Sequence, residues 1–93
     1  MTTSAAPSIH DEPTQELLLL MAKMLVNDSN AVELDCFEEN GTIMFNLRVA
    51  TADIGKVIGK QGQTARSLRT ILSASGMKLR RRYCLVIEEE TSE

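Results

Sequence analysis

Apolar residues recur at helical spacing in the first quarter of this 93-residue chain. The pattern predicts an amphipathic helix from about Pro13, a residue suited to the first turn of a helix, to the polar run that starts at Asn27. The stripe expected to face the core consists of Leu17, Leu20, Met21, Met24 and Leu25.

The pattern then changes to strict alternation, which is typical of half-buried strands. Asn40-Gly41, the preferred pair for a type I′ turn, separates two such segments and predicts a β-hairpin. The residues expected to point inward are Val32, Leu34 and Cys36 in the first strand and Ile43, Phe45, Leu47 and Val49 in the second, whereas Met44, Asn46 and Arg48 point outward. A last strand is expected over residues 83–87.

Two further helices are expected between the hairpin and the last strand. Thr51 can cap a short helix over residues 53–58. A longer helix over residues 63–75, with Gly76 as its C-cap, presents one apolar face formed by Ala65, Leu68, Ile71 and Leu72. The order is helix, strand, strand, helix, helix, strand, which predicts an α+β domain with three helices on one face of a small mixed sheet.

The tetrapeptide Gly59-Lys60-Gln61-Gly62 joins these two helices and is the strongest functional signal in the chain. Two glycines three residues apart leave backbone amides uncovered by a Cβ atom, and the following helix N-terminus favours an anion. The spacing does not fit a P-loop, since Gln61 stands where Ser or Thr is needed, nor does it fit the dinucleotide fingerprint G-x-G-x-x-G. The alternative is a tight helix–helix turn in which the glycines only provide positive φ.

Charge is segregated along the chain, although the net charge is only −3. Residues 1–47 contain one cation and eight acids, residues 48–83 contain nine cations and one acid, and residues 84–93 contain four acids. The basic segment surrounds the glycine loop, which indicates a polyanionic ligand. A solvated basic face is the alternative.

Several other classes of protein find no support in the composition. His10 is the only histidine, and Cys36 and Cys84 have no metal-binding spacing, so neither a metal site nor a disulfide is expected. Asp53 is the only acid in the basic segment, which disfavours an enzyme, and no cofactor is expected.

The run Leu17–Leu20 is too short to cross a bilayer, and no signal peptide is visible. Three aromatic residues are too few for an RRM or OB stacking surface.

The order of elements, with Val57-Ile58-Gly59-Lys60-Gln61-Gly62 between the second and third helices, resembles a type II KH domain. A chain made only of this unit is similar to the small bacterial KhpA family. The resemblance covers about residues 14–90, leaving residues 1–13 as a tail expected to be disordered and residues 91–93 as a C-terminal end. It implies a narrow groove for single-stranded RNA, in which the GxxG loop clamps the backbone of about four nucleotides. It also implies homodimers and a larger KH-containing partner, KhpB, also called Jag.

The resemblance assigns the site residues by position. Gly59 and Gly62 allow close approach of the RNA backbone, and Lys60 and Gln61 project toward phosphates. Val57, Ile58 and Ala65 contribute to the apolar floor of the groove, and Lys56, Arg66 and Arg69 border it. The role of Arg80-Arg81-Arg82 stays open between further phosphate contact and solubility.

The sequence thus predicts a cytoplasmic, non-catalytic protein that binds single-stranded RNA and acts as an RNA chaperone or post-transcriptional regulator. The alternative is a dimerisation or adaptor domain that acts mainly through protein partners such as a KhpB/Jag-like protein. The outward residues Met44, Asn46 and Arg48 could serve such a partner.

Overall fold

The computed structural model describes residues 11–90 and contains three α-helices, three short 3-10 turns and three strands in this range. The tail prediction for residues 1–10, which include His10, and the C-terminal residues 91–93 lie outside the described residues. In chain order the elements are α1 (Glu12–Leu25), β1 (Glu33–Glu39), β2 (Thr42–Val49), α2 (Ile54–Ile58), α3 (Gln63–Leu79) and β3 (Arg82–Glu89). The predicted α+β order of a type II KH domain is confirmed.

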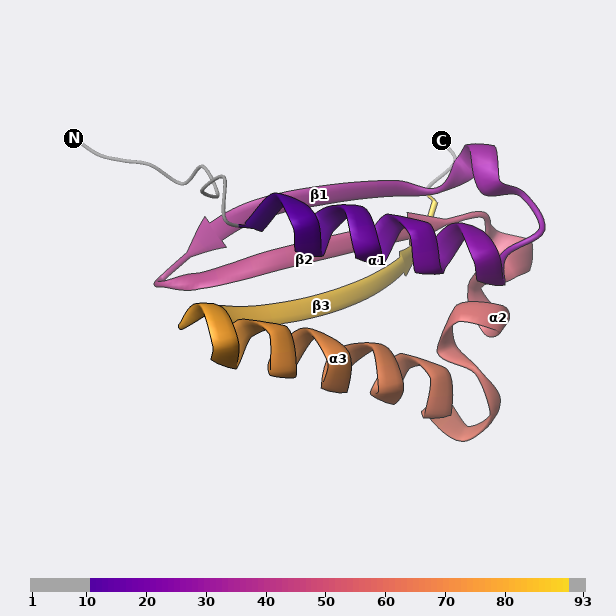
Figure 1. Ribbon diagram of the computed structural model, residues 1–93. Helices are drawn as coiled ribbons and strands as arrows, with labels where there is room; N and C mark the ends of the chain where they lie inside the picture. The colour runs from indigo at the N-terminus through magenta and orange to yellow at the C-terminus, as the bar shows by residue number, and fades with distance from the viewer. Residues whose placement is uncertain (1–10, 91–93) are drawn as a thin grey trace.

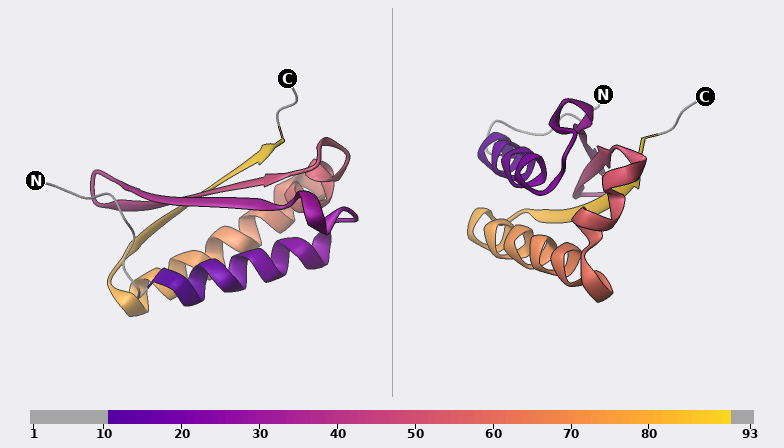
Figure 2. Two further views of the ribbon diagram at one scale, coloured as in Figure 1. Left: turned by 90° about the horizontal axis from the view of Figure 1, so that it is seen from above. Right: turned by 90° about the vertical axis from the view of Figure 1, so that its right-hand side faces the viewer.

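The three strands form one mixed sheet in the order β1-β2-β3. β1 and β2 are antiparallel, and β2 and β3 are parallel. The two long helices, α1 and α3, lie side by side under one face of this sheet, and α2 lies at one end (Figures 1 and 2). The predicted layer arrangement is therefore confirmed, and the opposite face of the sheet is not covered by the described residues.

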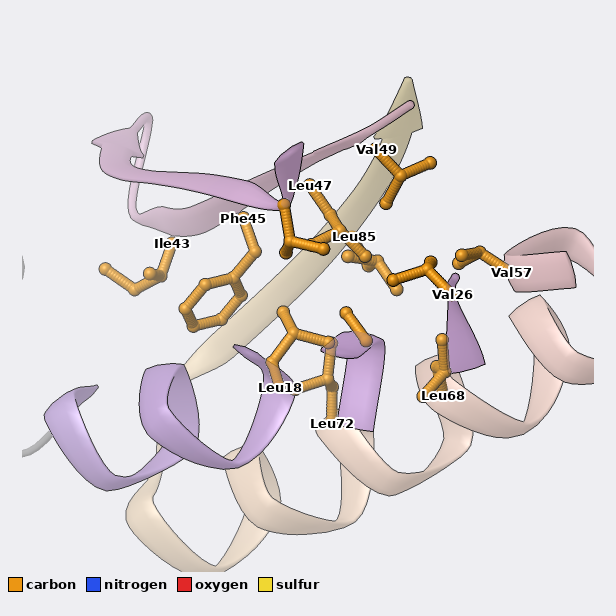
Figure 3. Packing of buried hydrophobic residues seen from close by; sticks show 12 residues of the cluster. Leu18, Val26, Ile43, Phe45, Leu47, Val49, Val57, Leu68, Leu72 and Leu85 are labelled. Atoms are coloured by element: carbon orange, nitrogen blue, oxygen red, sulfur yellow. The ribbon is translucent and has the colours of Figure 1, made fainter. Parts of the chain in front are cut away.

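The predicted hairpin forms as expected. Asn40 and Gly41 have φ values of 54° and 84°, which a type I′ turn requires at both central positions. The turn sets the register, in which Cys36 pairs with Phe45. All four inward positions predicted for β2 are buried, with Phe45 fully inaccessible in the centre of the core (Figure 3).

The phase predicted for α1 is only partly right: Met21 and Leu25 of the predicted stripe are half-buried and pack against the core. The buried residues of the helix are Thr14, Leu18 and Ala22. Three members of the predicted stripe are instead exposed: Leu17 at 43%, Leu20 at 57% and Met24 at 76%. The reason is that residues 17–21 are all apolar, so the sequence offers more than one apolar face and packing against the sheet selects between them. Ile71 of α3, also predicted to be inward, is 42% exposed.

The predicted C-cap at Gly76 is also wrong, because α3 continues to Leu79 and Arg80 takes the left-handed conformation after it. The amide of Arg81 donates to the Gly76 carbonyl at 2.8 Å, and that of Arg80 donates to Met77 at 3.3 Å, which is the Schellman pattern. Gly76 has a packing role instead. A Cβ there would lie 2.6 Å from the Arg81 carbonyl oxygen, so only glycine lets the chain turn back this tightly.

A buried ion pair fixes the start of α1 to the start of β3. Asp11 is fully buried, and its carboxylate accepts two hydrogen bonds from Arg81, at 3.0 and 2.7 Å, and one from the Tyr83 hydroxyl at 2.8 Å. Residues 11–13, assigned to the tail, therefore belong to the folded part of the chain. Of the three arginines with an open role, Arg81 is structural, because its guanidinium is engaged by Asp11. Hydrogen bonding to Asp11 also raises the pKa of Arg81.

Cys36 and Cys84 are both free thiols. Cys36 pairs with Phe45 and Cys84 pairs with Met44, and neighbouring residues of β2 point to opposite faces of the sheet. The two thiols are thus on opposite faces and cannot form a disulfide with each other. Burial, followed by the nearby Asp11 charge, raises the pKa of Cys36 to about 11, so this thiol is protonated at neutral pH.

Candidate functional site

The glycine loop begins where α2 ends. Gly59 leaves the helix with φ 80° and ψ 171°, and its amide donates to the Gly55 carbonyl at 2.8 Å. A short 3-10 turn over Lys60–Gly62 leads directly into α3. The loop therefore lies at the N-terminus of a 17-residue helix, where the first amides have no partner in the helix. Thr51 does not cap α2 as predicted, since it begins a separate 3-10 turn and no side-chain cap is formed.

The two glycines of the loop differ in what surrounds them. A Cβ at Gly59 would overlap the Thr64 hydroxyl and lie 2.7 Å from the Thr64 Cβ. A Cβ at Gly62 would meet only the end of the Arg66 side chain, 3.9 Å away. Gly59 is thus required by internal packing, whereas the space in front of Gly62 is open to a ligand.

The residues between the glycines are exposed, and one of them has an unusual backbone conformation. Gln61 has φ 55° and ψ 27°, a left-handed conformation that costs a non-glycine residue about 1 kcal/mol. Its carbonyl accepts a hydrogen bond of 3.3 Å from Arg66 Nη2, which places this guanidinium over the loop. Such conformations persist where neighbouring contacts impose them, and they are common in ligand clamps.

Asp53 fixes the entrance to the loop. It is 2% exposed, and its carboxylate accepts a hydrogen bond of 3.0 Å from the Asp28 amide in the α1–β1 connection. This bond is the main reason that the pKa of Asp53 is lowered. The Lys56 ammonium lies 3.7 Å from the same carboxylate, so part of its charge is balanced internally. Within residues 11–90, Lys60 makes no ion pair, and its charge is fully available to a ligand.

The predicted site residues fall into three groups by exposure. The polar side chains are exposed: Lys56, Lys60, Gln61, Arg66 and Arg69. Ile58, Gly59 and Gly62 are half-buried. Val57 and Ala65 are buried, at 0% and 3% exposure, so they can contribute to the apolar floor only from beneath, and their assignment to the groove stays a prediction. Val57 belongs to the hydrophobic core and supports the loop from within (Figure 3).

A hollow of about 180 Å³ lies between α3 and β3. α3 runs alongside β3 in the ribbon, with the glycine loop at one end of the helix (Figure 1). The hollow is lined by Arg69, Leu72, Ser73, Tyr83, Cys84 and Leu85. Of these, sequence analysis identified only Arg69 as a site residue. Leu72 and Leu85 were expected in the core or a strand, and no local pattern shows that the two elements enclose a surface hollow.

The described chain thus combines a type II KH fold with an open glycine loop, and sequence comparison adds a family. The family described as KhpA/KhpB, KH domain, matches residues 15–87. The chain belongs to this family. The match includes the glycine loop, α2, α3 and all of α1 except its first three residues.

Curated relatives support the same assignment. The chain is similar to the "RNA-binding protein KhpA" of Aquifex aeolicus, at 45% identity over 75 residues, which cover 81% of this chain and 95% of the relative. The protein of that name from Treponema pallidum is 44% identical over 73 residues, covering 78% of this chain and 91% of the relative. The one from Caldanaerobacter subterraneus is 40% identical over 72 residues, covering 77% and 96%. No solved structure gives a significant match.

The family and the helix lengths bear on two other classes of protein, enzymes and membrane-spanning proteins. The expectation of a non-enzymatic protein agrees with the family, whose curated relatives are named as RNA-binding proteins. Within residues 11–90, no helix is long and apolar enough to cross a membrane.

Proposed function

We propose that this protein binds single-stranded RNA in the cytoplasm through the glycine loop and the adjoining side of α3, and acts as an RNA chaperone or post-transcriptional regulator. The observation that carries the proposal is the open space in front of Gly62 at the N-terminus of α3, next to Lys60, which makes no ion pair within residues 11–90. A phosphate can approach the backbone there, and the side chain nearest to that position is the cationic end of Arg66. The names of the curated relatives support RNA as the polyanion.

Each residue of the proposed site has a distinct role. The backbone between Gly59 and Gly62 approaches the sugar-phosphate strand, and Lys60 supplies a point charge to a phosphate. Arg66 is held over the loop by the Gln61 carbonyl, so it can contact the same phosphate or the next one. Lys56 adds a weaker positive charge because Asp53 lies beside it. Half-buried Ile58 offers apolar surface to a base.

Binding to a short single strand should weaken steeply as salt is added. If three or four phosphates are neutralised, the slope of log affinity against log salt concentration should be about −2 to −3 for a single strand. Fluorescence anisotropy with an unstructured 10-nucleotide RNA between about 50 and 200 mM salt measures this slope. The same RNA paired with its complement is the control and should bind more weakly, because a narrow groove admits one strand. A slope near zero would exclude the basic segment as the contact surface.

We also propose that two copies of the chain pair through the helical layer. The apolar helical surface, defined here as Leu17, Leu20 and Met24 of α1 and Ile71 of α3, is exposed. A shallow hollow of about 200 Å³ connects α1 and α3 there and is lined by Met21, Met24, Leu25, Thr64, Ser67 and Leu68. Exposed apolar patches of this kind mark interaction surfaces. Two linked RNA sites would raise the affinity for a long strand through avidity.

Under the adaptor hypothesis, the protein acts through a different surface. It places a partner such as a KhpB/Jag-like protein on the outer sheet face, where Arg48 was expected to be available. In the structure Arg48 donates to Glu33 and Asp35, at 3.0 and 2.7 Å from Nη2 and Nη1, so its guanidinium is engaged within the sheet. The helical layer is the more exposed apolar surface, and we favour it as the site of self-association.

Leu20→Glu should convert a dimer into a monomer, because each copy would then bury a carboxylate in an apolar contact. Sedimentation velocity at about 10 and 100 μM protein measures the change. Met77→Glu is the matched control, since Met77 is 80% exposed but lies in the last turn of α3, outside the apolar helical surface. A wild-type chain that sediments as a monomer at both concentrations would refute self-association and favour a different protein partner.

A further inference from the structure

The hollow between α3 and β3 contains one hydrogen bond that joins its two walls. Arg69 Nε donates to the Leu85 carbonyl oxygen at 3.3 Å. Leu72 and Leu85, only 2% and 4% exposed, lie at the bottom of the hollow, and Ser73, Tyr83 and Cys84 complete its lining. Figure 3 shows both leucines in the cluster between the helices and the sheet. The result is an apolar recess with a guanidinium at its rim.

The Leu85 carbonyl lies on the open edge of the sheet. β3 is the last strand in the order β1-β2-β3, so one of its edges has no neighbouring strand among the described residues. Along a strand, successive residues direct their backbone groups to alternate sides. The amide of Glu90 donates to Val49 at the end of β2, so residues an odd number of positions away, including Leu85, face the open edge. A ligand in the hollow therefore meets both this edge and Arg69.

The hydrogen bond to Leu85 restricts the orientation of the guanidinium. Arginine carries five N–H donors in one plane, and the bond from Nε uses one of them. Within residues 11–90, no hydrogen bond or ion pair engages the Nη1 and Nη2 atoms of Arg69, whereas Arg48 and Arg81 are both engaged by carboxylates. Arg69 thus presents a planar pair of donors whose orientation is set by the protein.

The position of Arg69 along α3 suits a base rather than the phosphate at the loop. It follows Gly62 by seven residues, which corresponds to about 10 Å along a helix. A strand that is held by its phosphate at the loop and extends along α3 would bring its next bases over the apolar recess. A lysine ammonium at this position would attract any nucleotide. The planar guanidinium of arginine, with its two parallel N–H donors, discriminates between base edges.

We propose that Arg69 is a specificity-determining residue that selects guanine in the bound strand; this inference rests on the proposed RNA-binding function. Guanine presents two adjacent acceptors, O6 and N7, which match the two free donors of a guanidinium. Adenine places an N6 amino group beside N7, so one of its two groups would oppose a donor. Uracil separates its two carbonyl groups by an N–H group. The apolar recess receives the face of the base, and Arg69 reads its edge.

The test uses 10-nucleotide uridine RNAs that carry one central guanosine, adenosine, cytidine or 7-deazaguanosine, with the all-uridine RNA as reference. The wild-type protein should bind the guanosine RNA about tenfold more tightly than the adenosine and cytidine RNAs, measured by anisotropy. The 7-deazaguanosine RNA, which lacks the N7 acceptor, should lose most of that preference. Equal affinities for all five RNAs, or a preference for cytidine, would overturn the assignment.

Arg69→Lys should abolish the guanosine preference, measured as the ratio of the affinities for the guanosine and all-uridine RNAs, because the charge stays and the planar pair of donors is lost. Arg66→Lys is the matched control, one turn earlier on α3, and should keep the preference. A guanosine preference that survives in Arg69→Lys would refute the role of Arg69. Failure of the wild-type protein to bind any of the five RNAs would instead refute the proposed function itself, and with it the base assignment.

Discussion

Replacing both Lys60 and Gln61 with aspartate should abolish RNA binding and leave the fold intact. Both side chains are exposed, so the change removes one cation and adds two carboxylates without opening a cavity. The new charges would stand where a phosphate is expected, at the entrance to α3. We expect a loss of at least about 100-fold in affinity, which corresponds to about 2.8 kcal/mol. Anisotropy with the 10-nucleotide RNA measures the affinity, and a circular dichroism melt checks the fold.

A second double variant controls for the change in net charge. Met77→Asp with Lys78→Asp alters the charge by the same amount on exposed side chains in the last turn of α3. These positions follow Gly62 by 15 and 16 residues, about 22 to 24 Å along the helix. That separation exceeds two Debye lengths at physiological salt, so the effect on a phosphate at the loop should be small. Equal losses in the two double variants would show that overall charge, and not the loop, determines binding.

The strands of this protein could be predicted more completely than its helices, for a physical reason. Alternation has a period of two residues, so a strand such as β2 has only two possible faces and one of them is clearly apolar. A helix that contains an unbroken apolar run, as α1 does from Leu17 to Met21, has several acceptable faces. The buried face of α1, formed by Thr14, Leu18 and Ala22, was decided by packing against the sheet, which the sequence does not display.

The features that sequence analysis missed depend on residues far apart in the chain. Asp11 and Arg81 are 70 positions apart, and nothing near either residue predicts that they form a buried pair. Gly76 was interpreted as a local helix stop, whereas it is needed because the chain returns over it at Arg81. The hollow beside Arg69 likewise arises only when α3 packs against β3. The glycine loop could be predicted because four consecutive residues and the next helix define it.

Gly62→Asn should distinguish a loop that contacts RNA from a loop that only turns the chain. Gly62 has φ 74° and ψ 13°, a left-handed conformation that asparagine tolerates better than other side chains. Since a Cβ there meets nothing closer than 3.9 Å, Gly62→Asn should keep most of the stability of the wild-type protein. If an RNA backbone must approach this position, the added side chain should lower the affinity at least tenfold, about 1.4 kcal/mol.

Two other glycines provide the comparison that makes this result specific. Gly41, in the β1–β2 turn, has φ 84° and open space around its Cβ position, so Gly41→Asn tests the same substitution away from the loop. It should retain both stability and RNA affinity. Gly59→Asn should instead unfold more easily, by about 2 kcal/mol, because its side chain overlaps Thr64 and overpacking of this kind is destabilising.

Thermal melts and RNA titrations of the three variants therefore give three different expected outcomes. Gly41→Asn should change neither property, Gly59→Asn should mainly change stability, and Gly62→Asn should mainly change affinity. The contrast between Gly41 and Gly62 is the decisive one, because both positions combine a left-handed φ with open space and differ in whether they lie in the proposed clamp. If Gly62→Asn binds RNA as tightly as Gly41→Asn, Gly62 serves the turn alone and the strand must be held elsewhere on the basic segment.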